Sequence, residues 1–300
     1  MRETGSTAAS ETASAGRETG YSCEAGAICE TGRKTSPLFT ETESYRDNLV
    51  EVPSDMAEVQ NNIEIYHQQS IDQILEKEGD NIPAAEKARI RQGVQNLEAV
   101  PYDMEKRVAG SYNYETDTMQ IAYITPTQLE RTTKHETNHF SSYNHEAIIP
   151  DDQGYTTIRQ SGIRDVSWYH SNETGADIMI FDNNRDMNEG ITTMFTQGQL
   201  EEINMEAAVE AIRQNGYSKA TEVCGEMENL VGHETIAKAY YSGDTISLEH
   251  SIDGLGGEGT FRRLSKCIDE TTYNPDPEIR SKAMAEAQEL LARMHERKVK

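Results

Sequence analysis

The chain has 300 residues, of which 35% are hydrophobic, and its mean hydropathy is −0.74, so we expect part of it to remain outside a packed core. Its formal net charge of −24 excludes nucleic acid as an expected partner and disfavours an anionic membrane surface, because both would repel it. No apolar run approaches the ~20 residues needed to cross a bilayer, so no membrane span is expected.

The N-terminal segment repeats a short polar theme: Arg-Glu-Thr-Gly begins at Arg2 and at Arg17, and related tetrapeptides begin at Cys23 and Cys29. It shows neither helical nor strand periodicity, so residues 1–44 are predicted to be a disordered, low-complexity tail. The first residues also lack the apolar region of a secretory signal. We therefore expect a cytosolic protein, a protein exported by a signal-independent route, or a shortened sequence.

Two helices and a hairpin are predicted after the tail. From Ser54, apolar residues recur mostly at spacings of three and four, which predicts an amphipathic helix that ends at Gly79. Pro83 opens a second predicted helix, which covers residues 83–100. Residues 106–125 then alternate apolar and polar side chains on either side of a polar turn, a pattern that predicts a β-hairpin.

The tetrapeptide that begins at Thr125 has the features of a helix start. Thr125 is the expected N-cap, Pro126 the first helical residue, and Gln128 the side chain that would complete a capping box. The helix predicted from this start covers about residues 126–143.

After the helix at residues 126–143, we predict a second β-hairpin, followed by a mostly helical segment. The hairpin has its turn at residues 172–175, and helical patterns dominate after Asp186. For residues 45–300 we therefore predict a single mostly helical α+β domain. We expect a small antiparallel sheet beside the helix at 126–143.

That helix carries the pentapeptide His-Glu-Thr-Asn-His. Residues four apart differ by ~40° around an α-helix, so His135 and His139 leave from one face and can both bind one metal ion at ~2.0–2.1 Å. Glu136 lies one step around the helix, where it can hold and deprotonate a metal-bound water without being a ligand. Three other His-Glu pairs in the chain lack a second histidine at this offset.

A zinc ion would need a third protein ligand, and two candidates exist. His145 lies ten residues after His135, the spacing of the pattern H-E-x-x-H-x-x-G-x-x-H, but Ser142 occupies the glycine position of that pattern. Met179 is a candidate for the methionine turn of such sites. Alternatively, Glu189 opens a predicted helix at residues 187–197, from which its carboxylate can face the first helix and complete a two-histidine, one-glutamate set.

Three segments resemble a bacterial zincin-like metallopeptidase of the gluzincin type. They are the octapeptide that begins at His135, Ser-Gly-Ile from Ser161, and Asn-Glu-Gly-Ile-Thr-Thr-Met-Phe-Thr from Asn188. The resemblance extends over roughly residues 105–250. It implies a zincin-like fold and one zinc ion per chain, bound by His135, His139 and Glu189, with Glu136 as the general base. It therefore favours Glu189 over His145.

The activity that this resemblance implies is hydrolysis of a peptide bond in a protein or peptide substrate. The enzyme could be an exported bacterial effector. Zinc would lower the pKa of its water towards ~7, and Glu136 would pass the proton to the leaving amine. Sites of this kind usually stabilise the oxyanion with a tyrosine or histidine, and the sequence does not choose among the candidates Tyr169, His170, Tyr240 and Tyr241.

A zincin-shaped scaffold that binds a protein partner, with weak or no catalysis, is the alternative function. Charged residues, Arg131 and Lys134, precede the first histidine where such enzymes usually have uncharged ones. Thr193 lies one helical turn after Glu189, at a position where an acidic residue often supports a zinc histidine. These departures affect catalysis more than zinc binding.

Overall fold

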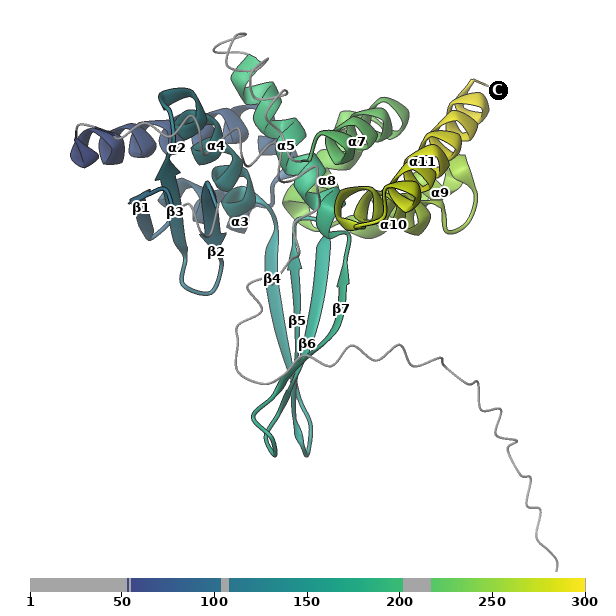
Figure 1. Cartoon of the computed structure of the whole chain (residues 1–300), viewed down its shortest axis with the longest axis horizontal. Coiled ribbons are helices and arrows are strands. Elements are labelled where there is room, and N and C mark those ends of the chain that lie inside the picture. The colour runs from purple at the N-terminus through teal and green to yellow at the C-terminus, as the bar shows by residue number, and fades with distance from the viewer. Residues whose placement is uncertain (1–52, 54, 104–107, 202–216, 300) are drawn as a thin grey trace, which may run out of the picture. The chain divides into compact units, whose positions relative to one another are not determined.

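The computed structural model describes residue 53 and residues 55–103, 108–201 and 217–299. The predicted tail at residues 1–44 lies outside the described residues. The described part is a mostly helical α+β fold, which confirms the predicted fold class (Figure 1). None of its helices combines the length and apolar character needed to cross a membrane.

The first predicted helix is confirmed, whereas the second ends earlier than predicted. Helix α2 (Met56–Lys77) leads through a short 3-10 turn (Gly79–Asn81) to α3 (Ala84–Gln92). Gly93 has a φ of 71°, a left-handed value that ends the helix. The helix prediction for residues 93–100 was therefore wrong.

Part of that misassigned segment is a strand. Strand β1 (Asn96–Pro101) pairs in parallel with β3 (Thr118–Tyr123), and β2 (Gly110–Asn113) pairs with β3 as the predicted hairpin. The Gln60 side chain of α2 binds one edge of β1, accepting from the N–H of Ala99 and donating to the carbonyl of Leu97, each at 2.9 Å. The sheet beside the central helix is thus mixed, not antiparallel.

Helix α4 (Pro126–Ser141) begins as its sequence predicts. Thr125 is the N-cap, and its hydroxyl accepts from the N–H of Gln128 at 3.2 Å. The helix packs on α2 and on strands β2 and β3, where Leu129 and Phe140 join the hydrophobic core. This packing fixes the orientation of the helix that carries both histidines.

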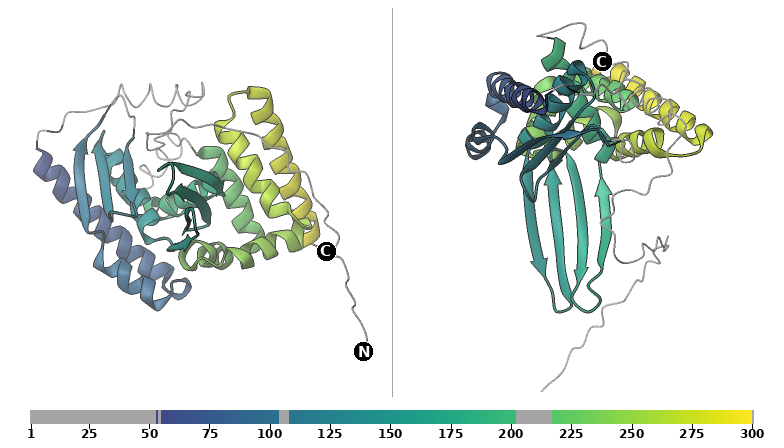
Figure 2. Two further views of the ribbon diagram at one scale, coloured as in Figure 1. Left: turned by 90° about the horizontal axis from the view of Figure 1, so that it is seen from below. Right: turned by 60° about the vertical axis from the view of Figure 1, so that its left-hand side comes forward.

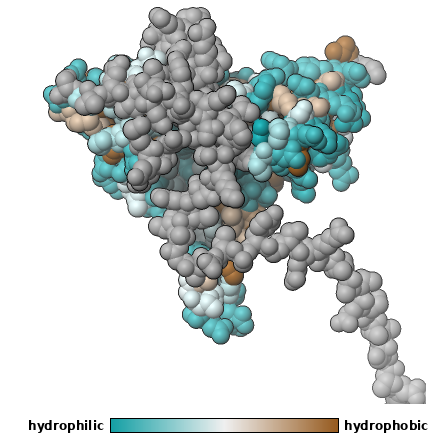
Figure 3. Space-filling view, viewed as in Figure 1, coloured by the Kyte–Doolittle hydropathy of each residue, from teal (hydrophilic) through white to brown (hydrophobic). Residues whose placement is uncertain are grey.

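A second sheet follows α4, and the sequence predicted only half of it. Its four antiparallel strands pair in chain order and are β4 (Asn144–Pro150), β5 (Gly154–Ser161), β6 (Arg164–Ser171) and β7 (Asp177–Asn183). The predicted second hairpin is β6–β7. We call residues 144–183 the blade, because the strands extend away from the helices in Figure 1 and in the right-hand view of Figure 2. Hydrophilic residues cover its free end, and apolar residues appear farther up (Figure 3).

Helices complete the fold after the blade, as predicted. They are α5 (Arg185–Glu201), α7 (Ser218–Val231), α8 (His233–Ser242), α9 (Thr245–Gly256), α10 (Thr260–Tyr273) and α11 (Pro277–Lys298). Their buried apolar side chains join those of α2 and α4 in one core cluster. Helix α5 packs against both α4 and α7, and this position brings its first turns to the histidines.

Candidate metal centre

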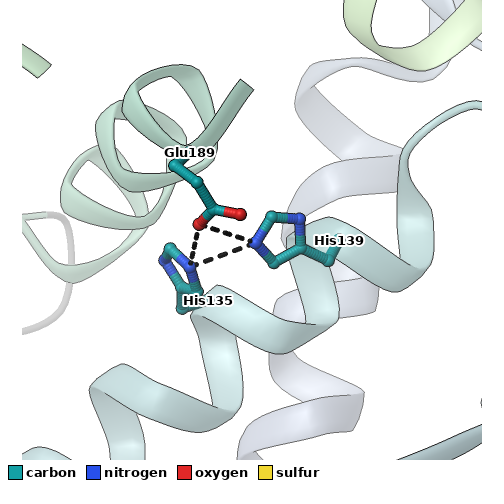
Figure 4. A group of neighbouring side chains, drawn as sticks. All are labelled: His135, His139 and Glu189. Atoms are coloured by element: carbon teal, nitrogen blue, oxygen red, sulfur yellow. Dashed lines mark hydrogen bonds and ion pairs between the residues drawn. The ribbon is translucent and has the colours of Figure 1, made fainter. Parts of the chain in front are cut away.

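Helices α4 and α5 together present a group of three possible metal ligands, His135, His139 and Glu189 (Figure 4). The Nε2 atoms of the two imidazoles lie 3.2 Å apart. The Oε2 atom of Glu189 lies 3.3 Å from Nε2 of His139 and 3.4 Å from Nε2 of His135. The side chains are 15 to 20% exposed, so solvent can reach the group.

This triangle of donor atoms matches three corners of a zinc tetrahedron. Ligand atoms bonded at ~2.0–2.1 Å with tetrahedral angles are about 3.3 Å apart, which is the spacing that the three atoms show. Two imidazole nitrogens and one carboxylate oxygen are also ligand types that zinc accepts. The residues present therefore fit a divalent ion with a fourth position left for water or substrate.

Glu189 and His139 shift each other's pKa values. Burial alone would raise the pKa of Glu189, but the charges and bonds of His139 and His135 outweigh it and hold that pKa well below its usual value. Burial alone would lower the pKa of His139, but Glu189 raises it overall. Three lone pairs that converge within 3.4 Å repel one another unless a proton or a metal ion lies between them.

The second ligand candidate from the sequence, His145, does not belong to this group. It lies exposed on β4, where its ring stacks on Tyr143. The chain leaves α4 at Ser142 with a φ of −61°, so it does not make the left-handed exit that glycine provides in the alternative pattern. Met179 lies on β7 and is 48% exposed. The geometry thus brings Glu189, and not His145, to the two histidines.

A hydrogen-bond chain behind His139 was not predicted. The hydroxyl of Thr192 lies 3.5 Å from Nδ1 of His139, and it donates to the carbonyl of Asn188 at 2.8 Å. Since that hydrogen is used, the buried Tyr240 hydroxyl donates to Thr192, at 2.7 Å, and Nδ1–H of His139 is a further donor. This assignment leaves the Nε2 lone pair of His139 free to face the group.

Thr193 occupies the position where such enzymes often have an acidic residue that supports a zinc histidine, and it gives no such support here. Its hydroxyl is buried and has no hydrogen-bond partner in the part of the chain that the structure describes. Thr192, one residue earlier, supplies the contact instead. Both positions are threonine, so no sequence signal could have distinguished them.

Removing the hydroxyl of Thr192 should weaken metal binding. We expect Thr192→Val to lower zinc affinity by about 10- to 100-fold, because His139 loses the partner that orients its ring and fixes its tautomer. Thr192→Ser should restore the affinity. Competition with a chromophoric chelator measures it.

Thr193→Val is the matched control for this change. It removes a hydroxyl with no partner among the described residues, so zinc affinity should stay within about twofold of the native value. Equal losses in the two valine variants would refute the role of Thr192.

Glu136 lies between the histidines and the edge strand β2. Burial raises the pKa of its carboxyl, whereas the charges of His135 and His139 and a hydrogen bond from the backbone of Tyr112 act in the opposite direction. A side chain at Gly110 would come within 2.9 Å of Cγ of Glu136, so glycine is needed for this close approach. The strand thus excludes water from one side of the carboxylate.

The four candidates for oxyanion stabilisation differ in position. Tyr241 donates to Asn138 at 3.0 Å, inside the core. Tyr169 and His170 interact with aspartates of the blade. Tyr240 is the candidate whose hydroxyl is linked to the group, but it is buried and reaches His139 only through Thr192. We therefore interpret Tyr240 as a positioning residue.

Hydrogen bonds hold the start of β6 against α5, next to the three candidate ligands. The N–H of Ile163 donates to the Asn188 side chain at 3.0 Å, and the side-chain amide of Asn184 donates to the carbonyl of Ile163 at 3.1 Å. Gly162 has a φ of 58°, and a Cβ there would lie 2.4 Å from Asn188. Two of the three segments in the family resemblance, Ser-Gly-Ile and Asn-Glu-Gly, are therefore in direct contact.

A cation near the group, Arg164, was also not predicted. Its guanidinium makes two hydrogen bonds with Asp182, at 2.7 and 2.8 Å, and its charge acts to lower the pKa of His139. Arginine at the start of a strand is common and carries no sequence signal of a site. Only the fold reveals its position.

Comparisons with protein-family models, with curated proteins and with solved structures found no match to the chain. The family resemblance, the identity of the metal and the activity therefore stay predictions. The group of two histidines and a glutamate is what the structure contributes to them.

Proposed function

We propose that the protein is a zinc-dependent endopeptidase in which His135, His139 and Glu189 hold the ion and Glu136 is the general base. The observation that carries this proposal is the triangle of donor atoms with sides of 3.2, 3.3 and 3.4 Å. Helical spacing brings together the two histidines, but Glu189 comes from a separate helix fifty residues later. Such convergence is what a metal site requires.

The residues around the triangle support hydrolysis as its chemistry. A bound zinc ion would supply Lewis acidity, which polarises a carbonyl and makes water more acidic. Glu136 follows the first histidine and is buried, and its raised pKa suits a group that takes a proton from water and returns it to a leaving amine. Arg164 would stabilise negative charge that develops near His139.

Metal analysis of the purified protein tests the ligand set. We expect about one zinc per chain in the native protein. Removal of a hydrogen-bond partner behind a ligand lowers metal affinity by about 10- to 100-fold. Glu189→Ala removes a ligand and should lower zinc affinity by more than that. His145→Ala removes the other candidate and should retain the zinc, because His145 lies exposed on β4. Loss of zinc in His145→Ala, or full retention in Glu189→Ala, would overturn the ligand assignment.

A further inference from the structure

The blade exposes large apolar side chains on both of its edge strands. In the described part of the chain, β4 and β7 each pair with another strand on one side only. On β7, Ile178, Met179 and Ile180 are 48 to 56% exposed, and on β4, Ile148 and Ile149 are 60 and 52% exposed. Apolar residues together with unpaired backbone groups on an edge favour the addition of another strand.

The two edge strands differ in how well they are protected against pairing with another chain. Strand β4 contains Pro150, a residue that natural edge strands use to prevent pairing with other chains. Strand β7, Asp-Ile-Met-Ile-Phe-Asp-Asn, contains neither proline nor lysine. A register shift opposite Ser167 and Trp168 interrupts its pairing with β6 and leaves Ile180 as the extra residue. The outer part of β7, before this shift, is thus the less protected edge.

The hydrogen-bond pattern shows which backbone groups of β7 face outward. The N–H of Ser171 donates to the carbonyl of Ala176, so this pair is hydrogen-bonded. Because such pairs alternate along antiparallel strands, the N–H and C=O of Asp177 and Met179 point away from β6. The same reasoning from the bond between Asp151 and Gly154 places the backbone groups of Ile148 at the outer edge of β4.

The charge of the blade indicates what kind of strand would bind. Its free end carries Asp151, Asp152, Glu173 and Asp177, and residues 150–156 and 171–178 contain no lysine or arginine. A segment with basic residues would be attracted there, whereas an anionic lipid surface would be repelled. A second copy of this chain, with a net charge of −24, would be repelled as well.

We propose that the outer edge of β7 binds an extended segment of a partner protein by strand addition. The segment has alternating apolar side chains beside Met179 and lysine or arginine at the end that reaches the free end of the blade. The outer part of β7 lies before the register shift at Ile180, whereas α5, which carries Glu189, begins only at Arg185. The partner would therefore lie along the outer part of the blade and not at the candidate metal centre. This docking goes beyond the proposed function and needs no bound metal.

A labelled peptide tests this docking on the full chain. The probe has alternating valine and threonine with two lysines at each end, and fluorescence anisotropy is measured in the presence of EDTA so that metal plays no part. Met179→Pro removes an outward N–H without removing a bond to β6, and should weaken binding about tenfold. Ile148→Pro, the matched change on β4, should stay within about twofold. A peptide with glutamates in place of the lysines should bind at least about tenfold more weakly.

Amide hydrogen exchange on the native chain tests the same docking without any substitution, so its result does not depend on whether the proline variants fold. Bound peptide should slow exchange at Asp177 and Met179 and leave Ile148 unchanged. Equal binding by both proline variants, protection of Ile148 alone, or preference for the glutamate peptide would overturn the proposal. So would a native dimer that Met179→Pro dissociates in sedimentation, because the occupant would then be a second copy.

Discussion

Replacing Glu136 with glutamine is expected to lower kcat/KM for peptide hydrolysis by about 10²- to 10⁴-fold while zinc stays bound. Glutamine has the shape of glutamate, so it fits beside Gly110 and β2, but it cannot take a proton from water. Since Glu136 is not a member of the donor triangle, the affinity for zinc should change little. Zinc content and hydrolysis of a peptide library, measured on the same samples, give both values.

Glu234→Gln is the control for this variant. Residues His233 and Glu234 form another His-Glu pair on a helix, and the Glu234 side chain is 73% exposed and bonds with Lys238. Hydrolysis should therefore stay within about twofold of the native rate. Loss of zinc in Glu136→Gln would show that the carboxylate is a ligand rather than the base. Native protein that holds zinc and cleaves no peptide would instead favour the scaffold alternative.

Local sequence signals predicted two members of the ligand group but not the third. His135 and His139 share one face of a helix whose start is marked by Thr125 and Pro126, so their proximity follows from helical geometry alone. Glu189 required the family resemblance, because nothing in the sequence fixes the angle between α4 and α5. The structure brings all three together, and the role of zinc stays a prediction.

Other elements could not be predicted, since their positions depend on distant parts of the chain. Strands β4 and β5 belong to a sheet with exposed side chains on both faces, so they lack the apolar–polar alternation of a half-buried strand. The residues of β1 are similar in composition to those of the preceding helix α3, so the sequence pattern does not separate the two elements. Pairing with β3 and the hydrogen bonds of Gln60 fix β1 in its extended form. A pattern within one segment of the sequence carries no information about these distant contacts.

Gly190→Ala is expected to destabilise the protein by about 1 to 3 kcal/mol, because it overfills the contact between α5 and α7. A Cβ at Gly190 would lie 2.8 Å from the backbone carbonyl carbon of Ala220 and 2.8 Å from Sγ of Cys224. The first of these atoms belongs to the backbone of α7, so one helix must move to make room. Glu189 precedes Gly190 and would move with α5, so zinc affinity should fall too. Urea unfolding and chelator competition measure the two effects.

Gly198→Ala on the same helix separates packing from backbone effects. No atom of the described residues lies within 4 Å of the Cβ that this change would add, and alanine has a higher helix propensity, so stability should rise by about 0.5 to 1 kcal/mol. If Gly190→Ala lowers the free energy of unfolding and Gly198→Ala raises it, glycine at 190 is required by the close approach of α7. This approach would then set the position of Glu189. If both substitutions stabilised the protein, the close packing of α5 on α7 could not be what holds Glu189 against the histidines.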